Sequence, residues 1–205
     1  MEVRVYAHKI ILDQISALRL GITDEYGLHK LVYSLFTKVR SNEEITQGKS
    51  SGIQWVTKEV IGQGYEIIAV SDRPINPHPN LTIKSLTIPD HFFDFSRYKL
   101  SMVINPTYMK NDSSRKICAY TKSEDIKQWF FRKIQNSGFS ADHLHIELIQ
   151  TSSFKKNGRY MKLVKATIVG EIQITDKALF LETYKKGIGR SRSFGCGLMQ
   201  ISPIQ

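Results

Sequence analysis

The spacing of apolar residues changes along the first forty positions of the chain. Residues 2–12 alternate well enough between apolar and polar to predict a strand. From residue 24 onward the apolar residues recur every three or four positions, which is the period of an amphipathic helix. These positions are Leu28, Leu31, Val32, Leu35, Phe36 and Val39. We therefore expect a helix over 24–39, with Thr23 as its N-cap.

The rest of the first half has the pattern of loops and strands. Residues 41–51 are polar and predict a loop. Two apolar stretches at 52–60 and 64–71 predict strands that join at a glycine turn, Gly62-Gln63-Gly64. Three prolines then exclude a long helix, and a further strand is expected near 81–88. The order of this half is strand, helix and three strands, with a proline-rich loop before the last one.

The second half follows the same order with both helices present. The expected elements are strands at 95–104 and, shorter, 115–119, a helix capped by Ser123 and stopped by Gly138, strands near 143–150 and 160–174, a helix from Thr175 and Asp176 to Tyr184, and a last strand beginning at Leu198. The dipeptide Asn157-Gly158 is a hairpin signal between the two middle strands.

This order of elements determines the expected fold. A β-α-β-β-α-β unit is the ferredoxin-like arrangement, and the first half is the same unit with one helix replaced by a loop. We predict an α+β protein of two tandem ferredoxin-like domains. The first covers residues 1–90 and the second covers residues 95–205.

Composition restricts the class of protein. A hydrophobic content of 41% in 205 residues supports a true core. The two cysteines, Cys118 and Cys196, fit a reduced cytosolic protein without a disulfide framework. The sequence has no N-terminal signal pattern and no apolar run of membrane-spanning length. We therefore expect a cytoplasmic location.

Charge is concentrated toward the C-terminus. The formal net charge is +10. Residues 151–205 hold ten Lys and Arg against three Asp and Glu, so +7 of that charge lies in the last quarter of the chain. Such a one-sided excess favours a polyanion as partner, and a solvated basic face is the alternative.

The densest basic stretch is a glycine-rich segment at 185–197. It combines four glycines with four cations, namely Lys185, Lys186, Gly187, Gly189, Arg190, Arg192, Gly195 and Gly197. Backbone N–H groups beside cations form a cradle for phosphate, and the charge favours such an anion-binding loop. The alternative is a helix C-cap at Gly187 followed by a hairpin before the final strand.

A tyrosine and a histidine on the first predicted helix are the candidate catalytic groups. Tyr26 and His29 are three residues apart, so they lie one above the other, and Tyr33 extends the stripe by a turn. His29 lies about 100° from Leu28 around the helix axis, on the shoulder of the apolar face. Histidine titrates near neutral pH and is the usual general acid or base. The alternative is an aromatic edge that only packs on the sheet.

Two segments of the chain resemble a known family. These are Leu28-His29-Lys30-Leu31 on the first helix and the stretch from Gly187 to Leu198, which reads Gly-x-Gly-Arg-x-Arg-x-Phe-Gly-x-Gly-Leu. Together with the order of elements, they resemble the CRISPR repeat-processing endoribonucleases, most closely the CasE subunit of Cascade-type complexes. That family has two ferredoxin-like (RNA-recognition-motif-like) domains.

The resemblance implies a metal-independent ribonuclease that needs no cofactor. Such enzymes cut precursor CRISPR RNA at the base of the repeat hairpin, by attack of a 2′-hydroxyl that leaves a 2′,3′-cyclic phosphate. Carried onto this chain, it makes His29 the general acid or base and Tyr26 its helper. Family members often keep the product RNA bound and join a larger CRISPR effector complex.

The remaining predicted RNA contacts rest on the charge of the residues and on their place in a hairpin, and not on the resemblance. Lys155, Lys156 and Arg159 flank the predicted hairpin turn and suit the phosphates of an RNA stem. Two other functions stay open at this point. One is a non-catalytic subunit that binds an RNA hairpin, and the other is a structural subunit that binds protein.

Overall fold

The computed structural model describes residues 4–113, 115–156 and 158–204. The chain divides into two compact units. The first unit contains the described residues up to Pro89 together with Ser193–Gly195. The second unit contains Asp90–Arg192 and the residues from Cys196 onward. A short C-terminal segment is therefore built into the N-terminal unit.

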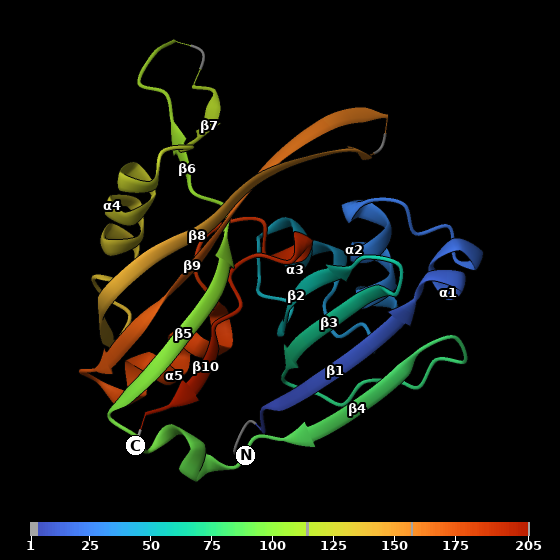
Figure 1. Ribbon diagram of the computed structural model, residues 1–205, viewed down its shortest axis with the longest axis horizontal. Helices are drawn as coiled ribbons and strands as arrows, with labels where there is room; N and C mark the ends of the chain where they lie inside the picture. Colours follow the sequence, from blue (N-terminus) through green and yellow to red (C-terminus); the bar gives the residue numbers. More distant parts are fainter. Residues whose placement is uncertain (1–3, 114, 157, 205) are drawn as a thin grey trace. The chain divides into compact units, whose positions relative to one another are not determined.

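The first unit is a four-stranded antiparallel sheet with helices (Figure 1). Its strands lie in the order β2-β3-β1-β4. In chain order the elements are β1 Tyr6–Asp13, α1 Gln14–Arg19, α2 Glu25–Ser34, α3 Asn42–Thr46, β2 Ile53–Val60, β3 Gly64–Ser71 and β4 Thr82–Thr87. The predicted strands are confirmed within a few residues where the structure describes them. The connection between β3 and β4 contains no helix in the described residues, as the prolines predict.

The core of this unit lies between the sheet and α2. The apolar stripe of α2 packs on side chains that alternate along β1, β2 and β3, and this alternation explains why one face of each strand is buried. Trp55, in the first half of β2, is fully buried. The residues of this core include Ile10, Leu12, Leu28, Leu31, Val32, Leu35, Ile53, Ile67 and Ala69.

Three local predictions in this unit are wrong. The helix ends at Ser34 rather than at 39, because the carbonyl of Leu35 accepts a hydrogen bond from the Asn76 backbone at 2.8 Å instead of continuing the helix. Its N-cap is Asp24 rather than Thr23, and the Asp24 carboxylate accepts from the Gly27 N–H. The predicted polar loop contains the short helix α3. Helix α1 was not predicted.

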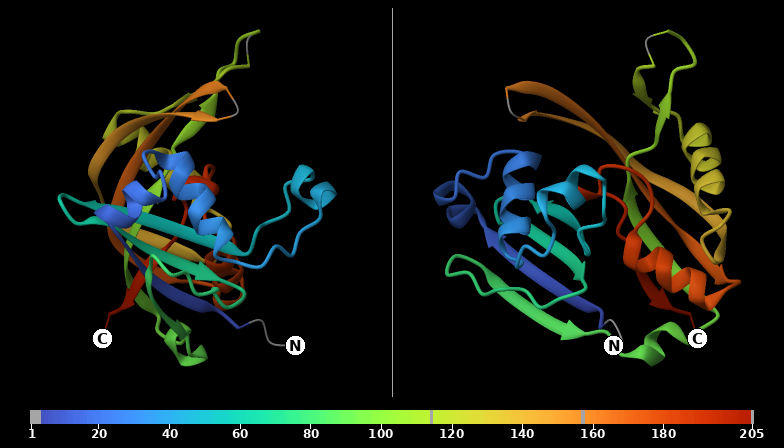
Figure 2. Two further views of the ribbon diagram at one scale, coloured as in Figure 1. Left: turned by 90° about the vertical axis from the view of Figure 1, so that its right-hand side faces the viewer. Right: turned by 180° about the vertical axis from the view of Figure 1, so that it is seen from behind.

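The second unit has the same sheet order. Its strands lie in the order β10-β5-β9-β8 and are all antiparallel. The elements are the 3-10 turn η1 Asp90–Phe93, β5 Arg97–Ile104, β6 Thr107–Met109, β7 Ile117–Ala119, α4 Ser123–Ile134, β8 Phe139–Lys156, β9 Arg159–Ile174, α5 Lys177–Lys186, the 3-10 turn η2 Arg192–Phe194 and β10 Gln200–Pro203. Helices α4 and α5 lie on the same face of this sheet (Figure 2). The predicted α+β fold of two ferredoxin-like units is confirmed.

The β8–β9 hairpin is longer than the sequence predicts. Its pairing runs from Phe139 opposite Ile174 to Lys156 opposite Arg159. Of the predicted Asn157-Gly158 turn, Asn157 lies outside the described residues, and Gly158 has a φ of 80°. Strand β5 pairs with β9 only from Ala166 onward, so the outer part of the hairpin is a two-stranded ribbon among the described residues (Figure 1).

The two helices of the second unit begin and end within a few residues of the predicted positions. Ser123 is the first residue of α4 rather than its cap, and the N-cap Lys122 makes no side-chain hydrogen bond. Helix α5 begins directly after its cap, Asp176, within two residues of the predicted start, and extends two residues beyond Tyr184. Strand β6 was not predicted. Across the described residues, no helix combines the length and the apolar character needed to cross a membrane.

Candidate active site

Helix α2 positions the two candidate catalytic side chains. Its buried residues face the core, and this leaves Tyr26 and His29 half-buried at the edge of the apolar stripe. The Tyr26 and His29 rings stack with centroids 5.9 Å apart and an interplanar angle of 13°. The ammonium of Lys30 lies 5.0 Å from the Tyr26 ring centroid. The structure therefore brings a hydroxyl, an imidazole and a cation together on one short segment.

Two more aromatic rings enclose the His29 imidazole. The Tyr33 ring is 4.7 Å from it, centroid to centroid, and the Phe194 ring is 5.2 Å from it. The Tyr33 hydroxyl is hydrogen-bonded to the Ser51 hydroxyl at 3.1 Å. Rings on several sides hold the imidazole in one orientation, and this preorganisation is what a proton-transfer group requires.

A backbone carbonyl sets the tautomer of His29. Its Nδ1 donates a hydrogen bond to the carbonyl oxygen of Ser193, with the two atoms 2.8 Å apart. Because a carbonyl can only accept, Nδ1 carries the proton, and in the neutral ring the lone pair resides on Nε2. The two residues are 164 positions apart in the sequence. This contact could not be predicted from the spacing of residues on α2.

A close backbone approach to Trp55 holds the segment that supplies this carbonyl within the first unit. Gly195 has a φ of 76°, and a Cβ atom there would lie 3.1 Å from the Trp55 ring. Phe194 is buried beside it. Only glycine combines this backbone conformation with such a short distance to an aromatic ring. The family-like glycine pattern is therefore needed here for packing against Trp55.

The rest of the glycine-rich segment belongs to the second unit and forms a closed loop. Gly187, with a φ of 73°, is the C-cap of α5, so the helix cap that was the alternative interpretation of this segment is present. The Ile188 N–H donates to the Gly197 carbonyl at 3.1 Å, and the Gly197 N–H donates to the Val103 carbonyl at 2.7 Å. These two bonds close the base of the loop and attach it to β5.

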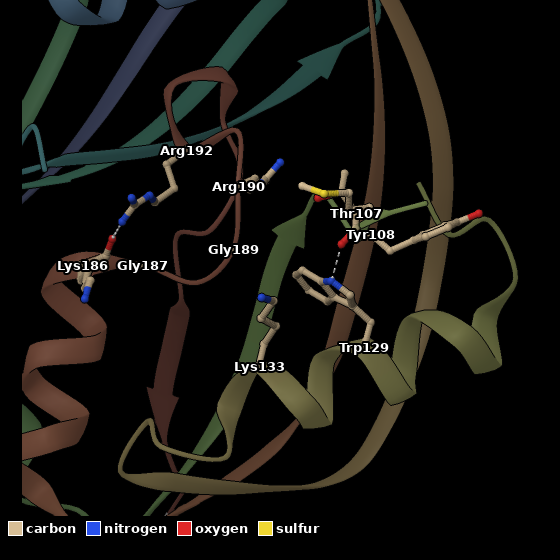
Figure 3. Close-up of a pocket in the computed structure, with 10 residues that line it drawn as sticks. Thr107, Tyr108, Trp129, Lys133, Lys186, Gly187, Gly189, Arg190 and Arg192 are labelled. Atoms are coloured by element: carbon tan, nitrogen blue, oxygen red, sulfur yellow. Dashed lines mark hydrogen bonds between the residues drawn. The ribbon is translucent and has the colours of Figure 1, made fainter. Parts of the chain in front are cut away.

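The top of the loop is fixed by side chains. Ser191 has a φ of 59°, which is rare for a residue other than glycine. The Asn105 amide nitrogen donates to its hydroxyl at 2.6 Å. On the far side, Arg192 donates from Nη1 to the Lys186 carbonyl at 2.6 Å, at the C-terminus of α5 (Figure 3). These bonds fix the backbone between Arg190 and Arg192.

The predicted binding residues fall into two groups in the second unit. Lys185, Lys186, Gly187, Gly189, Arg190 and Arg192 belong to the end of α5 and the loop that follows it. Lys155, Lys156 and Arg159 lie at the tip of the β8–β9 hairpin, where Lys156 pairs with Arg159. The ammonium of Lys155 lies 5.7 Å from the Tyr160 ring centroid. The hairpin tip therefore carries three cations beside an exposed tyrosine.

Sequence reasoning missed the residues that support these groups. The Ser193 carbonyl, Phe194 and Asn105 were not predicted to take part. The position of Phe194 inside the glycine-rich motif was the available signal. No group of three or more His, Cys, Asp or Glu residues within the described part of the chain is arranged to hold a metal ion.

The chain is similar to a known protein family and to several solved structures. The family model described as CRISPR associated protein matches residues 5–203. No curated protein matches the sequence significantly. Similar solved structures include the CRISPR endoribonuclease Cse3 bound to a 19-nucleotide RNA, with 14% identity, a TM-score of 0.80, and coverage of 98% of this chain and 100% of that one.

Two further structures have the same fold. One is the CRISPR-associated protein Cas6e from Escherichia coli K-12, with 20% identity, a TM-score of 0.73, and coverage of 97% of this chain and 100% of that one. The other is a chain of a CRISPR RNA-guided surveillance complex, with 18% identity, a TM-score of 0.68, and the same two coverages of 97% and 100%. At these identities the likeness establishes the tandem ferredoxin-like fold over nearly the whole chain.

Proposed function

This chain belongs to the CRISPR associated protein family, and on that premise we propose that it is an endoribonuclease that cleaves precursor CRISPR RNA within the repeat, at the base of its hairpin. The observation that carries the proposal is the hydrogen bond from His29 to Ser193. Ser193 directly follows Arg192 of the basic loop in the sequence. The bond thus joins the candidate base to the backbone of the glycine-rich segment, whose lysines and arginines are the predicted phosphate ligands.

The proposed reaction is a transesterification that uses no metal ion. The 2′-hydroxyl oxygen beside the scissile phosphate attacks phosphorus, and His29 accepts the hydroxyl proton on Nε2. The bond from phosphorus to the 5′-oxygen of the next nucleotide breaks, and that oxygen takes up a proton. The products are a 2′,3′-cyclic phosphate and a 5′-hydroxyl. The Ser193 carbonyl supports this role because it keeps the lone pair of the neutral ring on Nε2.

Two neighbours of His29 assist the reaction in this proposal. The Tyr26 hydroxyl is a proton donor on the stacked ring, one turn before His29. Lys30 brings a cation beside Tyr26, where it can stabilise the negative charge that builds up on the phosphate oxygens. Preorganised charge of this kind needs no metal ion to act on a phosphodiester.

The second unit holds the RNA in this proposal. We assign residues 1–90 as the catalytic domain and 95–205 as the RNA-holding domain. Lys155, Lys156 and Arg159 of the hairpin tip contact stem phosphates, and the cations of the glycine-rich loop contact further RNA phosphates. The similarity to Cse3 bound to RNA supports these assignments. The similarity to a chain of a surveillance complex supports assembly with other CRISPR subunits around the retained product.

Cleavage of repeat RNA in a chelator tests the function. The substrate is an end-labelled repeat RNA from the CRISPR array of the same genome, incubated with protein and EDTA. We expect one cut at the hairpin base and a cyclic-phosphate end that acid opens. An RNA with a single 2′-deoxy nucleotide at the cut position should bind and stay intact. Tight binding without any cutting would instead support the non-catalytic RNA-binding alternative.

A further inference from the structure

The second unit contains a hollow beside the predicted anion-binding loop. It has a volume of about 670 Å³ and opens between β6, the last turn of α4, the end of α5 and the glycine-rich loop (Figure 3). Four cationic residues line it, namely Lys133, Lys186, Arg190 and Arg192. None of the described residues in its lining is acidic. A concave surface with charge of one sign attracts an anion.

Trp129 builds the wall that joins the helix to the loop. Its Nε1 donates to the Thr107 carbonyl at 3.0 Å, and the side chain is only 3% exposed. A Cβ atom on Gly189 would lie 3.0 Å from the Trp129 ring, and the φ of Gly189 is +85°. The loop backbone therefore lies directly on the indole. Glycine is needed at this position to form the hollow.

Lys133 is the cation that α4 contributes. Its ammonium lies 5.8 Å from the Trp129 ring centroid, within the range of a cation–π contact. In Figure 3 the Lys133 side chain rises from the helix toward Gly189 and the loop that carries Arg190. The indole thus orients a lysine toward the loop cations, and this arrangement brings together charges from two distant parts of the sequence.

The rim of the hollow gives the ligand an apolar partner as well. Met109 is 55% exposed and belongs to the lining. The volume lies within the range of about 300–1,000 Å³ that suits small organic ligands, so a nucleotide with its phosphate fits. A paired stem cannot enter a hollow of this size. Tyr108 in the lining is 38% exposed. Positive charge beside an exposed aromatic ring is the combination that binds single-stranded nucleic acid, because bases stack on the ring.

We propose that this hollow binds an unpaired strand of RNA next to the hairpin, with Lys133 and Arg190 as phosphate ligands. The inference rests on the proposed RNA-processing function and adds a binding site to it. Lys133 is a binding residue that neither the charge pattern of the last quarter of the chain nor the family-like motifs include.

A short single-stranded probe tests the hollow without a hairpin. The probe is a labelled oligouridine of roughly ten nucleotides, titrated with the full chain at several salt concentrations. Lys133→Ala should raise Kd about 4-fold at 0.15 M salt and lower the salt slope by about 0.7, which is the effect of one lost phosphate contact. Arg132→Ala is the matched control, because this exposed residue precedes Lys133 on α4 and does not line the hollow.

Equal binding by Lys133→Ala and wild type, with equal salt slopes, would overturn the proposal. So would displacement of oligouridine by an oligoglutamate peptide at the same concentration, because the hollow would then bind any polyanion. Loss of binding by Lys133→Ala with Arg132→Ala unchanged would support it.

Repeat RNAs with and without flanks then show which strand enters the hollow. Three RNAs are compared, with the hairpin alone, with its 5′ flank and with its 3′ flank. Lys133→Ala should weaken binding of one flanked RNA about 4-fold and leave the hairpin alone unchanged. Equal weakening for the hairpin alone would place the stem at Lys133 and contradict the proposal. If wild type bound no repeat RNA, the proposed function would fail, and the oligouridine result would still judge the hollow.

Discussion

Two histidines of the first unit have opposite surroundings. His8, at the middle of β1, is 2% exposed and bonds to a serine hydroxyl through each ring nitrogen, Nε2 to Ser71 at 2.9 Å and Nδ1 to Ser85 at 2.8 Å. Ser71 donates its own proton to the Arg73 carbonyl, so it accepts from Nε2, and Ser85 therefore donates to Nδ1 of the neutral ring. His8 is a structural residue of the sheet.

His29 lies on a helix, is half-buried, and has one nitrogen held by a backbone carbonyl from the far end of the chain. The fixed tautomer serves packing in His8, where both hydrogen bonds join neighbouring strands. In His29 it leaves a lone pair on Nε2 of a ring that stacks on Tyr26. Burial and the identity of the hydrogen-bond partners thus separate the structural role of His8 from the chemical role that we propose for His29.

Removing His8 should affect stability rather than chemistry. His8→Ala removes one hydrogen bond from the buried Ser71 hydroxyl and one from the exposed Ser85, and it opens a cavity in the sheet. We therefore expect the free energy of unfolding to fall by about 2–4 kcal/mol. Chemical denaturation measures this change. The cleavage rate of the folded protein should stay within a few fold of wild type. A large loss of rate in folded His8→Ala protein would contradict the division of roles.

Displacing the Ser193 carbonyl should affect chemistry through positioning. In Gly195→Ala the new Cβ meets the Trp55 ring and the backbone is strained, so the segment that carries Ser193 must shift. We expect the single-turnover cleavage rate to fall about 10–100-fold. Gly21→Ala is the matched control, because its φ is +63° and a Cβ there meets nothing within 4 Å. Equal rates in the two variants would remove the carbonyl from the mechanism.

Tyr26→Phe keeps the stacked ring and removes the hydroxyl. If that hydroxyl donates a proton, the single-turnover rate should fall roughly 10-fold. This loss is smaller than the roughly 100–10,000-fold that a general acid or base usually contributes. Tyr33→Phe is its control, since the Tyr33 hydroxyl is bonded to Ser51. That variant should lose about 0.5–1.5 kcal/mol of stability with little change in rate. The reverse pattern would exchange the roles of the two tyrosines.

The acid dependence of stability should report on His8. Burial lowers the pKa of His8 below the ordinary value of 6.5. The unfolded chain therefore binds the proton first, and stability should decrease as the pH falls below about 6.5, by at most about 1.4 kcal/mol per pH unit. The decrease should level off below the folded pKa. The difference between wild type and His8→Gln isolates this effect, and parallel stability curves would contradict it.

The sequence predicted the fold better than it predicted the details of the site. Strand periodicity, the proline-rich connection and the glycine turn were enough to predict the order of elements along the chain, because each reflects local backbone preference. The end of α2 was missed because a bond from Asn76 to the Leu35 carbonyl stops the helix, and that bond is not local. His29 and Tyr26 could be predicted from helical spacing.

Their supporting contacts could not be predicted in the same way. The Ser193 carbonyl and the Asn105 amide reach their partners only through the tertiary fold, across 164 and 86 positions of sequence. Lys133 was missed for a related reason. Its neighbours on α4 indicate only an ordinary basic helix end, and its place beside the glycine-rich loop depends on Trp129.

The most direct test of the central claim is the single-turnover cleavage of labelled repeat RNA by wild type and His29→Ala in EDTA, with binding measured in parallel. His91→Ala is the control, because His91 is exposed and lies outside α2. We predict that His29→Ala cuts about 100–10,000-fold more slowly, with an affinity within a few fold of wild type. His91→Ala should cut at the wild-type rate. Cleavage by His29→Ala at the wild-type rate would contradict the account.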